Sequence, residues 1–224
     1  MDLVVLDYKR PDPKLVEAFR QVSVASAHEC MDRKNYLDPS IHQFYPGMKL
    51  CGPALTCQCQ PLDNLTIHAA IHIAKPGDVL VATLGGNPNQ GPFGDCCTTS
   101  CIAKKMEGLV VDSGIRDGES IKNMGFPIFC KGHSVTGTIK NEFGSVNHPI
   151  SIGGQVVRPG DIILGDDDGV VVIPLEIAEV TLERALRRQA DEVIIRERFR
   201  NGEDAWTMGH WGDYLKKKGI DLNI

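Results

Sequence analysis

The segment GPFGDCCTTSCIAKKMEGLVVDSGIRD, residues 91–117, holds the features that decide the fold of this 224-residue chain. A glycine-rich loop follows the apolar run Val79–Leu84 and leads into a segment that can form a helix. A second apolar run, Gly108–Val111, then ends at the pair Arg116-Asp117. Apolar runs that alternate with helical segments are typical of an α/β fold.

The residues that follow these apolar runs carry the candidate chemistry. Glycine-rich loops let backbone N–H groups approach an anion, and a helix N-terminus favours negative charge. Ligands of α/β folds usually bind where strands end, and Arg116 and Asp117 stand at such an end. An Arg can bind a carboxylate or an enolate oxygen, and an Asp can hold a hard divalent cation. Since Asp95 lies 21 positions before Arg116, we expect loop, helix and strand end to converge on one site.

The spacing Gly91-x-x-x-Asp95, then twenty residues, then Arg116-Asp117 resembles the signature of a known family. The family is that of the class II pyruvate aldolases that act on 4-hydroxy-4-methyl-2-oxoglutarate and 4-carboxy-4-hydroxy-2-oxoadipate. Its superfamily, called RraA-like, also contains the non-catalytic regulator of ribonuclease E activity. Four further segments are similar to family segments: AHECMDR (27–33), HAAIHIAKPGDVLVA (68–82), GTIKNEFGSVNHPI (137–150) and PGDIILGDDDGVVVIP (159–174).

The resemblance implies a swivelling β/β/α sandwich, assembled as a trimer or as a pair of trimers. It implies aldol cleavage of a 4-hydroxy-2-oxo acid to pyruvate and a second oxo acid, with oxaloacetate decarboxylation as a side activity. Both reactions pass through a pyruvate enolate, which a divalent cation, Mg²⁺ or Mn²⁺, helps to stabilise. The alternative to a metal, a Schiff-base lysine, requires a desolvated Lys beside the substrate, and nothing marks Lys104 or Lys105 as buried.

By the resemblance, three side chains have roles in catalysis. Asp117 matches the direct metal ligand, and Arg116 matches the group that contacts the developing enolate and the substrate. Asp95 matches the carboxylate that orients water at the metal. Two alternatives involve no catalysis. Asp95 would only cap the helix that follows it, and Arg116-Asp117 would form a surface turn without a site.

Substrate binding and one further catalytic role also follow from the resemblance. The backbone amides around Cys96 and Cys97, which follow Gly94 and Asp95, match the cradle for the pyruvate carboxylate. Glu192 lies 75 residues after Asp117, as does a family glutamate that reaches the metal from an adjacent subunit. The helix around Glu192 is rich in charges, so a solvated surface position is the alternative. The paired cysteines stand where the aldolases carry bulky apolar residues.

The composition is that of an ordinary globular protein, with 42% hydrophobic and 24% charged residues. A net charge of −5 argues against a nucleic-acid partner, and no run approaches the roughly 20 apolar residues of a membrane span. Without a signal segment, we expect a cytoplasmic protein whose eight cysteines are reduced thiols. Cys96 and Cys97 are the exception, because a helix N-terminus lowers the pKa of a thiol, so we expect both to be reactive.

The remaining pattern predicts helices, strands and turns in an α/β domain spanning residues 1–175. The expected helices are a short one opening at Pro13, one over 23–33, and one over 64–74; residues 48–60 are expected to form a strand. A Pro-Gly-Asp turn recurs at 76–78 and 159–161, each time before an apolar strand. The three aspartates at 166–168 do not have the spacing of a calcium loop, and a polar hairpin turn is expected.

The pattern of apolar and charged residues changes in the segment 176–224. Apolar residues at helical spacing predict a helix of about 25 residues, about 38 Å long, whereas a compact chain of this size has a radius of gyration near ~17 Å. The helix is therefore expected to reach a neighbouring subunit, and the aromatic tail after it is expected to pack there. This extension resembles the aldolases and is reduced or absent in the short regulators. It therefore favours the aldolase over the alternative, a protein-binding regulator of ribonuclease E activity.

Overall fold

The long strand β2 (Leu50–Gln58) connects the two halves of the β-structure. In the computed structural model, which describes residues 2–222, its second half pairs with β3 (Val79–Thr83) in parallel, and its first half pairs with β9 (Ile162–Asp166) in antiparallel. The full sheet has the order β1-β5-β4-β3-β2-β9-β10, and β6 pairs with β2 off this path. The strands β2 to β5 are parallel, and β7 and β8 form a separate antiparallel hairpin.

The other elements are, in chain order, α1 (Pro13–Phe19), α2 (Val24–Cys30), β1 (His42–Gln43), α3 (Leu65–Ile73), α4 (Asp95–Ala103), β4 (Gly108–Val111), α5 (Gly118–Met124), β5 (Ile128–Cys130), β6 (Ser145–Val146), β7 (Ile150–Ile152), β8 (Gln155–Val157), β10 (Gly169–Ile173), a 3-10 turn (Leu175–Ile177), α6 (Ala178–Arg200), α7 (Ala205–Met208) and α8 (Trp211–Lys217). The expected helices at Pro13, 23–33 and 64–74 are confirmed, although the second is shorter than expected. It begins after its N-cap Ser23 and ends at Cys30.

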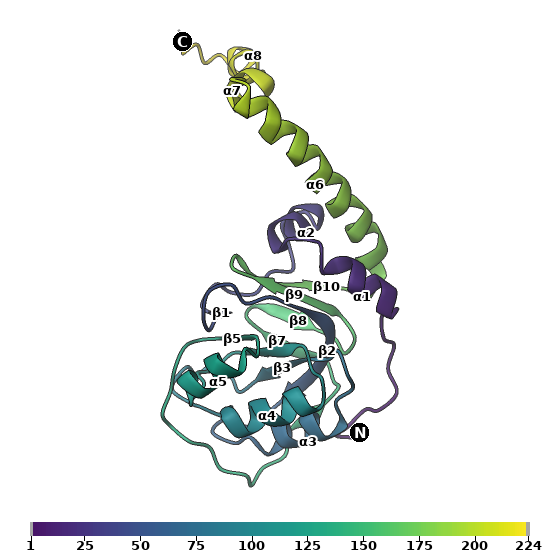
Figure 1. Ribbon diagram of the computed structural model, residues 1–224, viewed down its shortest axis with the longest axis vertical. Coiled ribbons are helices and arrows are strands. Elements are labelled where there is room, and N and C mark those ends of the chain that lie inside the picture. The colour runs from purple at the N-terminus through teal and green to yellow at the C-terminus, as the bar shows by residue number, and fades with distance from the viewer. Residues whose placement is uncertain (1, 223–224) are drawn as a thin grey trace.

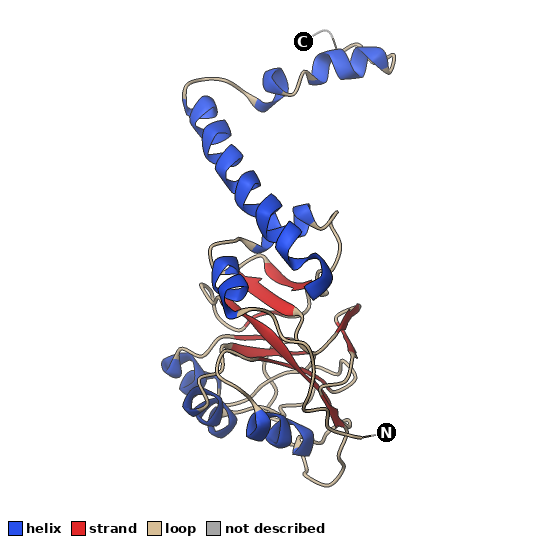
Figure 2. Cartoon of the chain, turned by 90° about the vertical axis from the view of Figure 1, so that its right-hand side faces the viewer, coloured by secondary structure: helices blue, strands red, loops and turns tan. Residues whose placement is uncertain are grey.

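Three apolar clusters lie between the layers of the molecule. The arrangement of the helices and strands in these layers can be followed in Figures 1 and 2. The first lies between the parallel strands and helices α3, α4 and α5, and the second lies between these strands and the β7–β10 region. The third lies between β9 and β10 and the helices α1, α2 and α6. The strand residues of β3 and β4 are all buried, as expected for parallel strands covered on both faces. The expected α/β sandwich with two β-layers and one α-layer is therefore confirmed.

The two Pro-Gly-Asp segments form the same turn. In each, the glycine adopts a left-handed conformation, with φ of 88° at Gly77 and 87° at Gly160. The buried carboxylate of Asp78 accepts from the N–H of Lys75, and that of Asp161 accepts from the N–H of Arg158, each at 2.8 Å. The shared sequence thus encodes a shared turn that starts β3 and β9.

The aspartates at 166–168 stabilise a hairpin turn between β9 and β10. Asp166 accepts from the N–H groups of Val24 and Asp168, and Asp167 accepts from that of Gly47. Within residues 2–222, no cluster of three or more His, Cys, Asp or Glu side chains is arranged to hold a metal ion. The expected polar turn is thus confirmed.

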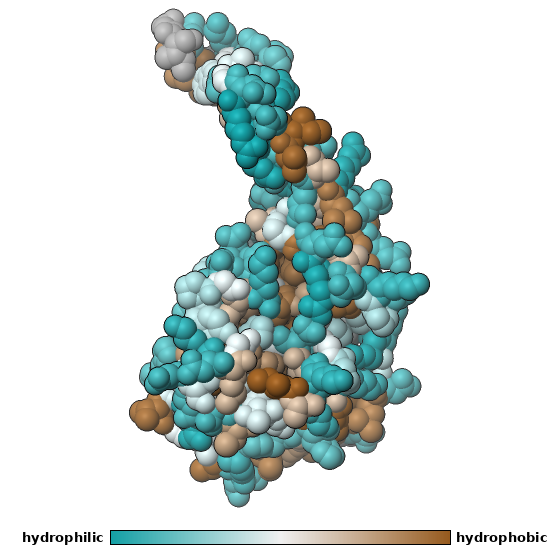
Figure 3. Space-filling model, viewed as in Figure 1, coloured by the Kyte–Doolittle hydropathy of each residue, from teal (hydrophilic) through white to brown (hydrophobic). Residues whose placement is uncertain are grey.

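The arm, defined here as residues 186–222, projects from the body (Figure 1). Only Ala178, Thr181 and Ala185, in the first two turns of α6, are buried, because they pack against α1, α2 and β10. Beyond them, large apolar side chains are exposed, and Figure 3 shows hydrophobic surface along the projecting helix. They include Val193, Ile194, Phe199, Trp206, Trp211 and Tyr214. None of the helices described here is long and apolar enough to cross a membrane.

Candidate active site

The loops after β3 and β4 meet at one edge of the sheet, as expected from the parallel order of these strands. Asp112, buried at the end of β4, accepts from the hydroxyl of Thr83 at 2.5 Å and from the N–H of Leu84 at 2.8 Å. The backbone N–H of Arg116 donates to the carbonyl of Phe93 at 3.1 Å. The two loops are therefore joined by short hydrogen bonds just before the candidate residues.

Gly94 allows the pair Arg116-Asp117 to lie directly against the start of α4. A Cβ atom at position 94 would overlap Oδ2 of Asp117 and would lie 3.2 Å from both Cγ and Nε of Arg116. The glycine is thus needed for close approach, since its own backbone is extended and open to any residue. The absence of a side chain at position 94 therefore allows Arg116 and Asp117 to pack against the start of α4.

Asp117 joins the starts of two helices. It precedes α5 in a left-handed conformation, with φ of 57° and ψ of 37°, which is uncommon for a residue with a side chain. Its carboxylate does not cap α5; instead, Oδ2 accepts from the N–H of Asp95 at 3.2 Å and lies 3.5 Å from Nε of Arg116. Both contacts use Oδ2, so Oδ1 remains available to a ligand.

The first turn of α4 presents backbone N–H groups to the same place. Its N-cap is Gly94, and the first intrahelical bond runs from the N–H of Thr98 to the carbonyl of Gly94 at 3.0 Å. The N–H groups of Cys96 and Cys97 therefore have no intrahelical acceptor. Asp95 is the first residue of the helix, and its carboxylate accepts a hydrogen bond from the hydroxyl of Ser120 at 3.4 Å. The alternative that Asp95 caps this helix is wrong.

The two cysteines differ from each other, and Cys97 differs from the expectation. Cys97 is buried, and burial raises the pKa of its thiol, outweighing the opposite effects of the charges of Lys140 and Arg116. The expectation of an ionised thiol at Cys97 is therefore wrong, because desolvation exceeds the effect of the helix N-terminus. Cys96, in contrast, is exposed and also lines the cavity described next.

These residues line a cavity of about 250 Å³. Its lining includes six of the predicted residues, namely Gly94, Asp95, Cys96, Cys97, Arg116 and Asp117. Four further polar residues, Asn64, His68, Thr138 and Lys140, line its walls. Sequence reasoning did not assign these four to the site, although His68, Thr138 and Lys140 lie in segments that resemble the family. Asn64 and His68 are one helical turn apart at the start of α3, which indicates that they share a face.

Asn64 is the most buried of these additional residues. Its Nδ2 donates to the carbonyl of Pro92 at 2.7 Å and so holds the loop before α4. Its Oδ1 is buried and has no hydrogen-bond partner among the residues that the structure describes. A buried acceptor of this kind can accept from a water molecule or a ligand.

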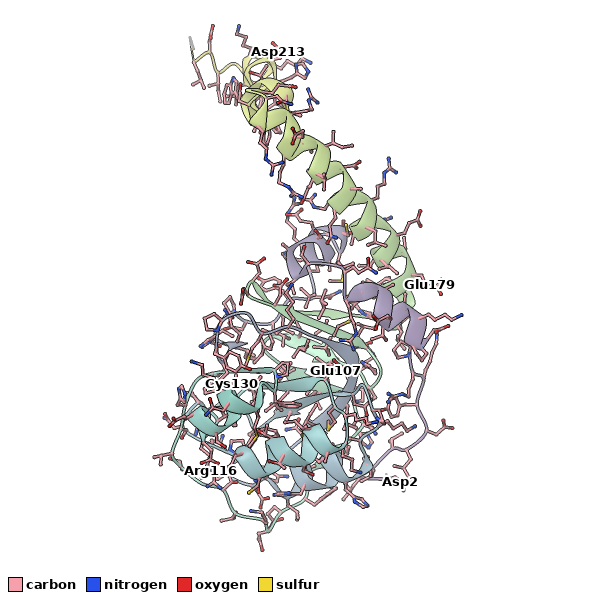
Figure 4. All side chains as sticks on the ribbon, viewed as in Figure 1. Asp2, Glu107, Arg116, Cys130, Glu179 and Asp213 are labelled. Carbon is pink, nitrogen blue, oxygen red and sulfur yellow. The ribbon has the colours of Figure 1, made fainter. Side chains whose placement is uncertain are left out.

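Glu192 does not reach this cavity within its own chain. It lies on α6 between Arg188 and Arg196, with which it forms ion pairs of 3.1 and 3.3 Å. Figure 4 shows Arg116 on the α4–α5 side of the body, whereas Glu179, near the start of α6, lies on the opposite side. Glu192 instead lines a separate groove of about 490 Å³ between α6, β9 and the segment joining α1 to α2. Its predicted action on another subunit stays a prediction.

The cavity offers a hard cation few protein ligands. The two carboxylates in it are those of Asp95 and Asp117, and hard oxygen donors of this kind suit Mg²⁺ or Mn²⁺. Mg²⁺ commonly retains several waters and uses only one or two carboxylates. The donor set therefore fits the implied divalent cation.

Comparison with known proteins defines the class. A family model described as RraA-like, Aldolase/RraA, matches residues 13–172, so the chain belongs to the RraA-like family. A protein of Halalkalibacterium halodurans, provisionally named 4-hydroxy-4-methyl-2-oxoglutarate aldolase, is 36% identical over 79% of this chain and 84% of its own length. One of Aromatoleum aromaticum with the same provisional name is 28% identical over 69% of this chain and 95% of its own.

Solved structures show the same fold. An uncharacterized protein from Pseudomonas syringae superposes with a TM-score of 0.81 at 26% identity, covering 89% of this chain and 94% of the other. The Streptomyces coelicolor protein RraAS2, described as an unusual member of the RNase ES inhibitor RraA family, superposes with a TM-score of 0.78 at 32% identity. That match covers 85% of this chain and 99% of the other.

Proposed function

We propose that this protein is a divalent-metal-dependent aldolase that cleaves 4-hydroxy-2-oxo acids bearing further carboxylates to pyruvate and a second oxo acid. The substrates we propose are 4-hydroxy-4-methyl-2-oxoglutarate and 4-carboxy-4-hydroxy-2-oxoadipate, and oxaloacetate would be decarboxylated in the same site. The observation that carries the proposal is the cavity in which Arg116, Asp117 and the start of α4 converge. The names of the relatives give further support.

Asp117 would hold the cation, with Asp95 beside it in the cavity. When bound, Mg²⁺ or Mn²⁺ would act as a Lewis acid that draws electrons from the 2-oxo group. The free N–H groups of Cys96 and Cys97 would bind the carboxylate next to this oxo group, and the positive end of α4 favours an anion there. Substrate orientation would thus come mainly from the backbone groups at the start of α4.

Arg116 and Asp95 would act on the two ends of the bond that breaks. Asp95 would receive the proton of the 4-hydroxyl through a water molecule, and the C4 oxygen would become the carbonyl of the second oxo acid. The electron pair of the C3–C4 bond would then pass to the pyruvate fragment. The guanidinium of Arg116 would stabilise the enolate oxygen, and a proton returned to C3 would complete pyruvate.

We also propose that the arm completes the site of another copy in a trimer or a hexamer. Glu192 would reach the cation of the neighbouring subunit, and the exposed apolar residues of α6 to α8 would pack on that subunit. The exposure of these side chains in a single chain supports this arrangement.

A coupled assay of pyruvate release tests the proposal. Purified protein with Mg²⁺ or Mn²⁺ is expected to release pyruvate from both 4-hydroxy-2-oxo acids and from oxaloacetate. Chelator treatment should abolish release, and added cation should restore it. Full release after rigorous removal of metal would contradict the metal route.

The alternative is a non-catalytic, protein-binding regulator of ribonuclease E activity, supported by the similarity to RraAS2. It predicts no pyruvate release from any of these acids, together with direct binding and inhibition of a ribonuclease of the E type. The family model matches residues 13–172, so α6 to α8 lie outside the segment that it covers.

A further inference from the structure

A second positively charged side chain lines the cavity, and the proposed mechanism does not use it. Lys140 lines the cavity together with Arg116, but the two are placed differently. Arg116 lies 3.5 Å from the carboxylate of Asp117, whereas Lys140 forms no ion pair within residues 2–222. The charges of Lys140 and Arg116 each oppose the rise in the pKa of the Cys97 thiol, and both side chains line the cavity at the start of α4.

The segment that carries Lys140 is anchored on both sides of it. The buried carboxylate of Asp63 accepts from the N–H groups of Asn141 and Glu142 at 2.6 and 2.8 Å. The N–H of Ile139 donates to Leu62 at 2.9 Å, and its carbonyl accepts from Asn64 at 3.1 Å. Lys140 is thus held on a backbone fixed against the start of α3.

His68 lies beside this cation on the first turns of α3. Its side chain is exposed, yet partial desolvation lowers the pKa of its imidazole, and the charge of Lys140 lowers this pKa further. The ring is therefore neutral at pH 7 and supplies an N–H donor rather than a second charge. Donor and cation together suit an anionic oxygen.

We propose that Lys140 and His68 form a subsite for the distal carboxylate of the substrate, the one furthest from the 2-oxo group. This inference rests on the proposed function, in which Arg116, the cation and the α4 amides bind the pyruvate half. A second carboxylate then needs a partner of its own, and Lys140 is the cavity's remaining cation among the described residues. The subsite would make the enzyme selective for dicarboxylic and tricarboxylic substrates.

Calorimetric titration with two matched acids tests the subsite without turnover. 2-Oxoglutarate carries the distal carboxylate, and 2-oxopentanoate has a methyl group in its place. With Mg²⁺ present, the wild-type protein should bind 2-oxoglutarate about tenfold or more tightly than 2-oxopentanoate, since a hydrogen bond to a charged group has a value of this order. K140A should lose most of this preference while binding 2-oxopentanoate as before, and K140R should retain it.

The matched control is K122A, which removes an exposed lysine of α5 that does not line the cavity. It should preserve the preference, and H68A should reduce it less than K140A does. A wild-type protein that binds 2-oxoglutarate no better than 2-oxopentanoate overturns the inference. A K140A protein that binds both acids more weakly by the same factor also overturns it. Lys140 would then act only through the overall positive charge of the cavity.

A kinetic arm separates this inference from the proposed function. 4-Hydroxy-4-methyl-2-oxoglutarate and 4-hydroxy-4-methyl-2-oxopentanoate share the bond to be cleaved, and only the first has the distal carboxylate. The ratio of their kcat/KM values should fall by about tenfold or more in K140A. If the wild-type protein releases pyruvate from neither acid, the aldolase proposal fails, and the binding preference still decides whether the subsite exists.

Discussion

The cavity and the arm show two ways in which a sequence specifies a surface. In the cavity, one chain supplies each contact: Gly94 makes room, Asp117 accepts from α4, and Asp63 anchors the wall. In the arm, a 23-residue helix buries only three residues near its start and exposes apolar side chains beyond them. Hydrophobic side chains at such density are typical of interaction surfaces. The comparison teaches that hydrogen bonds and packing within one chain shape the cavity, whereas the arm leaves apolar side chains exposed, which is why we propose that it packs on another copy.

The largest effect is expected at Arg116. R116K keeps a positive charge but loses the planar guanidinium, so turnover should fall about a hundredfold to a thousandfold, as for the loss of one transition-state donor. The binding of Mn²⁺, followed by calorimetry, should change little. Near-normal turnover of R116K would remove Arg116 from the mechanism.

Gly94 tests whether the close approach of loop and turn matters. A Cβ in G94A would overlap Oδ2 of Asp117, so the Arg116-Asp117 turn must move away from α4. A displacement near ~1 Å can lower a rate by about a hundredfold, and we expect a loss of this order in pyruvate release. The control is G137A, where a Cβ would lie 3.4 Å from Nη1 of Arg116 and should be tolerated better. Equal activity of G94A and wild type would show that the packing of Gly94 is dispensable.

Glu192 tests the link between the two regions. E192A and D117A should each be poor enzymes, with E192A reduced by about tenfold to a hundredfold, as for removal of a group that supports a metal site. Mixed assemblies made by co-expression should regain part of the activity, because some interfaces pair an intact Asp117 with an intact Glu192. Mixed oligomers that form yet are no more active than the average of the pure mutants would place Glu192 outside the site.

The cysteines give the smallest expected effect. Iodoacetamide should label exposed Cys96 before buried Cys97, whose raised pKa keeps its thiol protonated at neutral pH. The group added to this lining residue should lower activity, and pyruvate should slow the labelling. C96A should keep turnover close to wild type and resist inactivation. Inactivation of C96A at the wild-type rate would assign the effect to another thiol.

The strands and the central site could be predicted because their signals are local. The run Val79–Thr83 is buried throughout, a Pro-Gly-Asp turn precedes it, and the strand order brings Asp95 to Asp117. Lys140 could not be found in this way, since its position depends on tertiary hydrogen bonds to Asp63 from a segment without regular structure. The state of Cys97 was also mispredicted, because its burial depends on packing that the helix pattern does not reveal.

Binding of Mn²⁺ measured by electron paramagnetic resonance, alongside pyruvate release, tests the central claim that Asp117 holds a catalytic cation in this cavity. We predict that the wild-type protein binds Mn²⁺, that pyruvate alters the Mn²⁺ spectrum, and that the protein cleaves 4-hydroxy-4-methyl-2-oxoglutarate only when the cation is present. D117N should lose both the binding and the cleavage, because the amide lacks the carboxylate charge. A D117N protein that binds Mn²⁺ and releases pyruvate like the wild type would contradict the account.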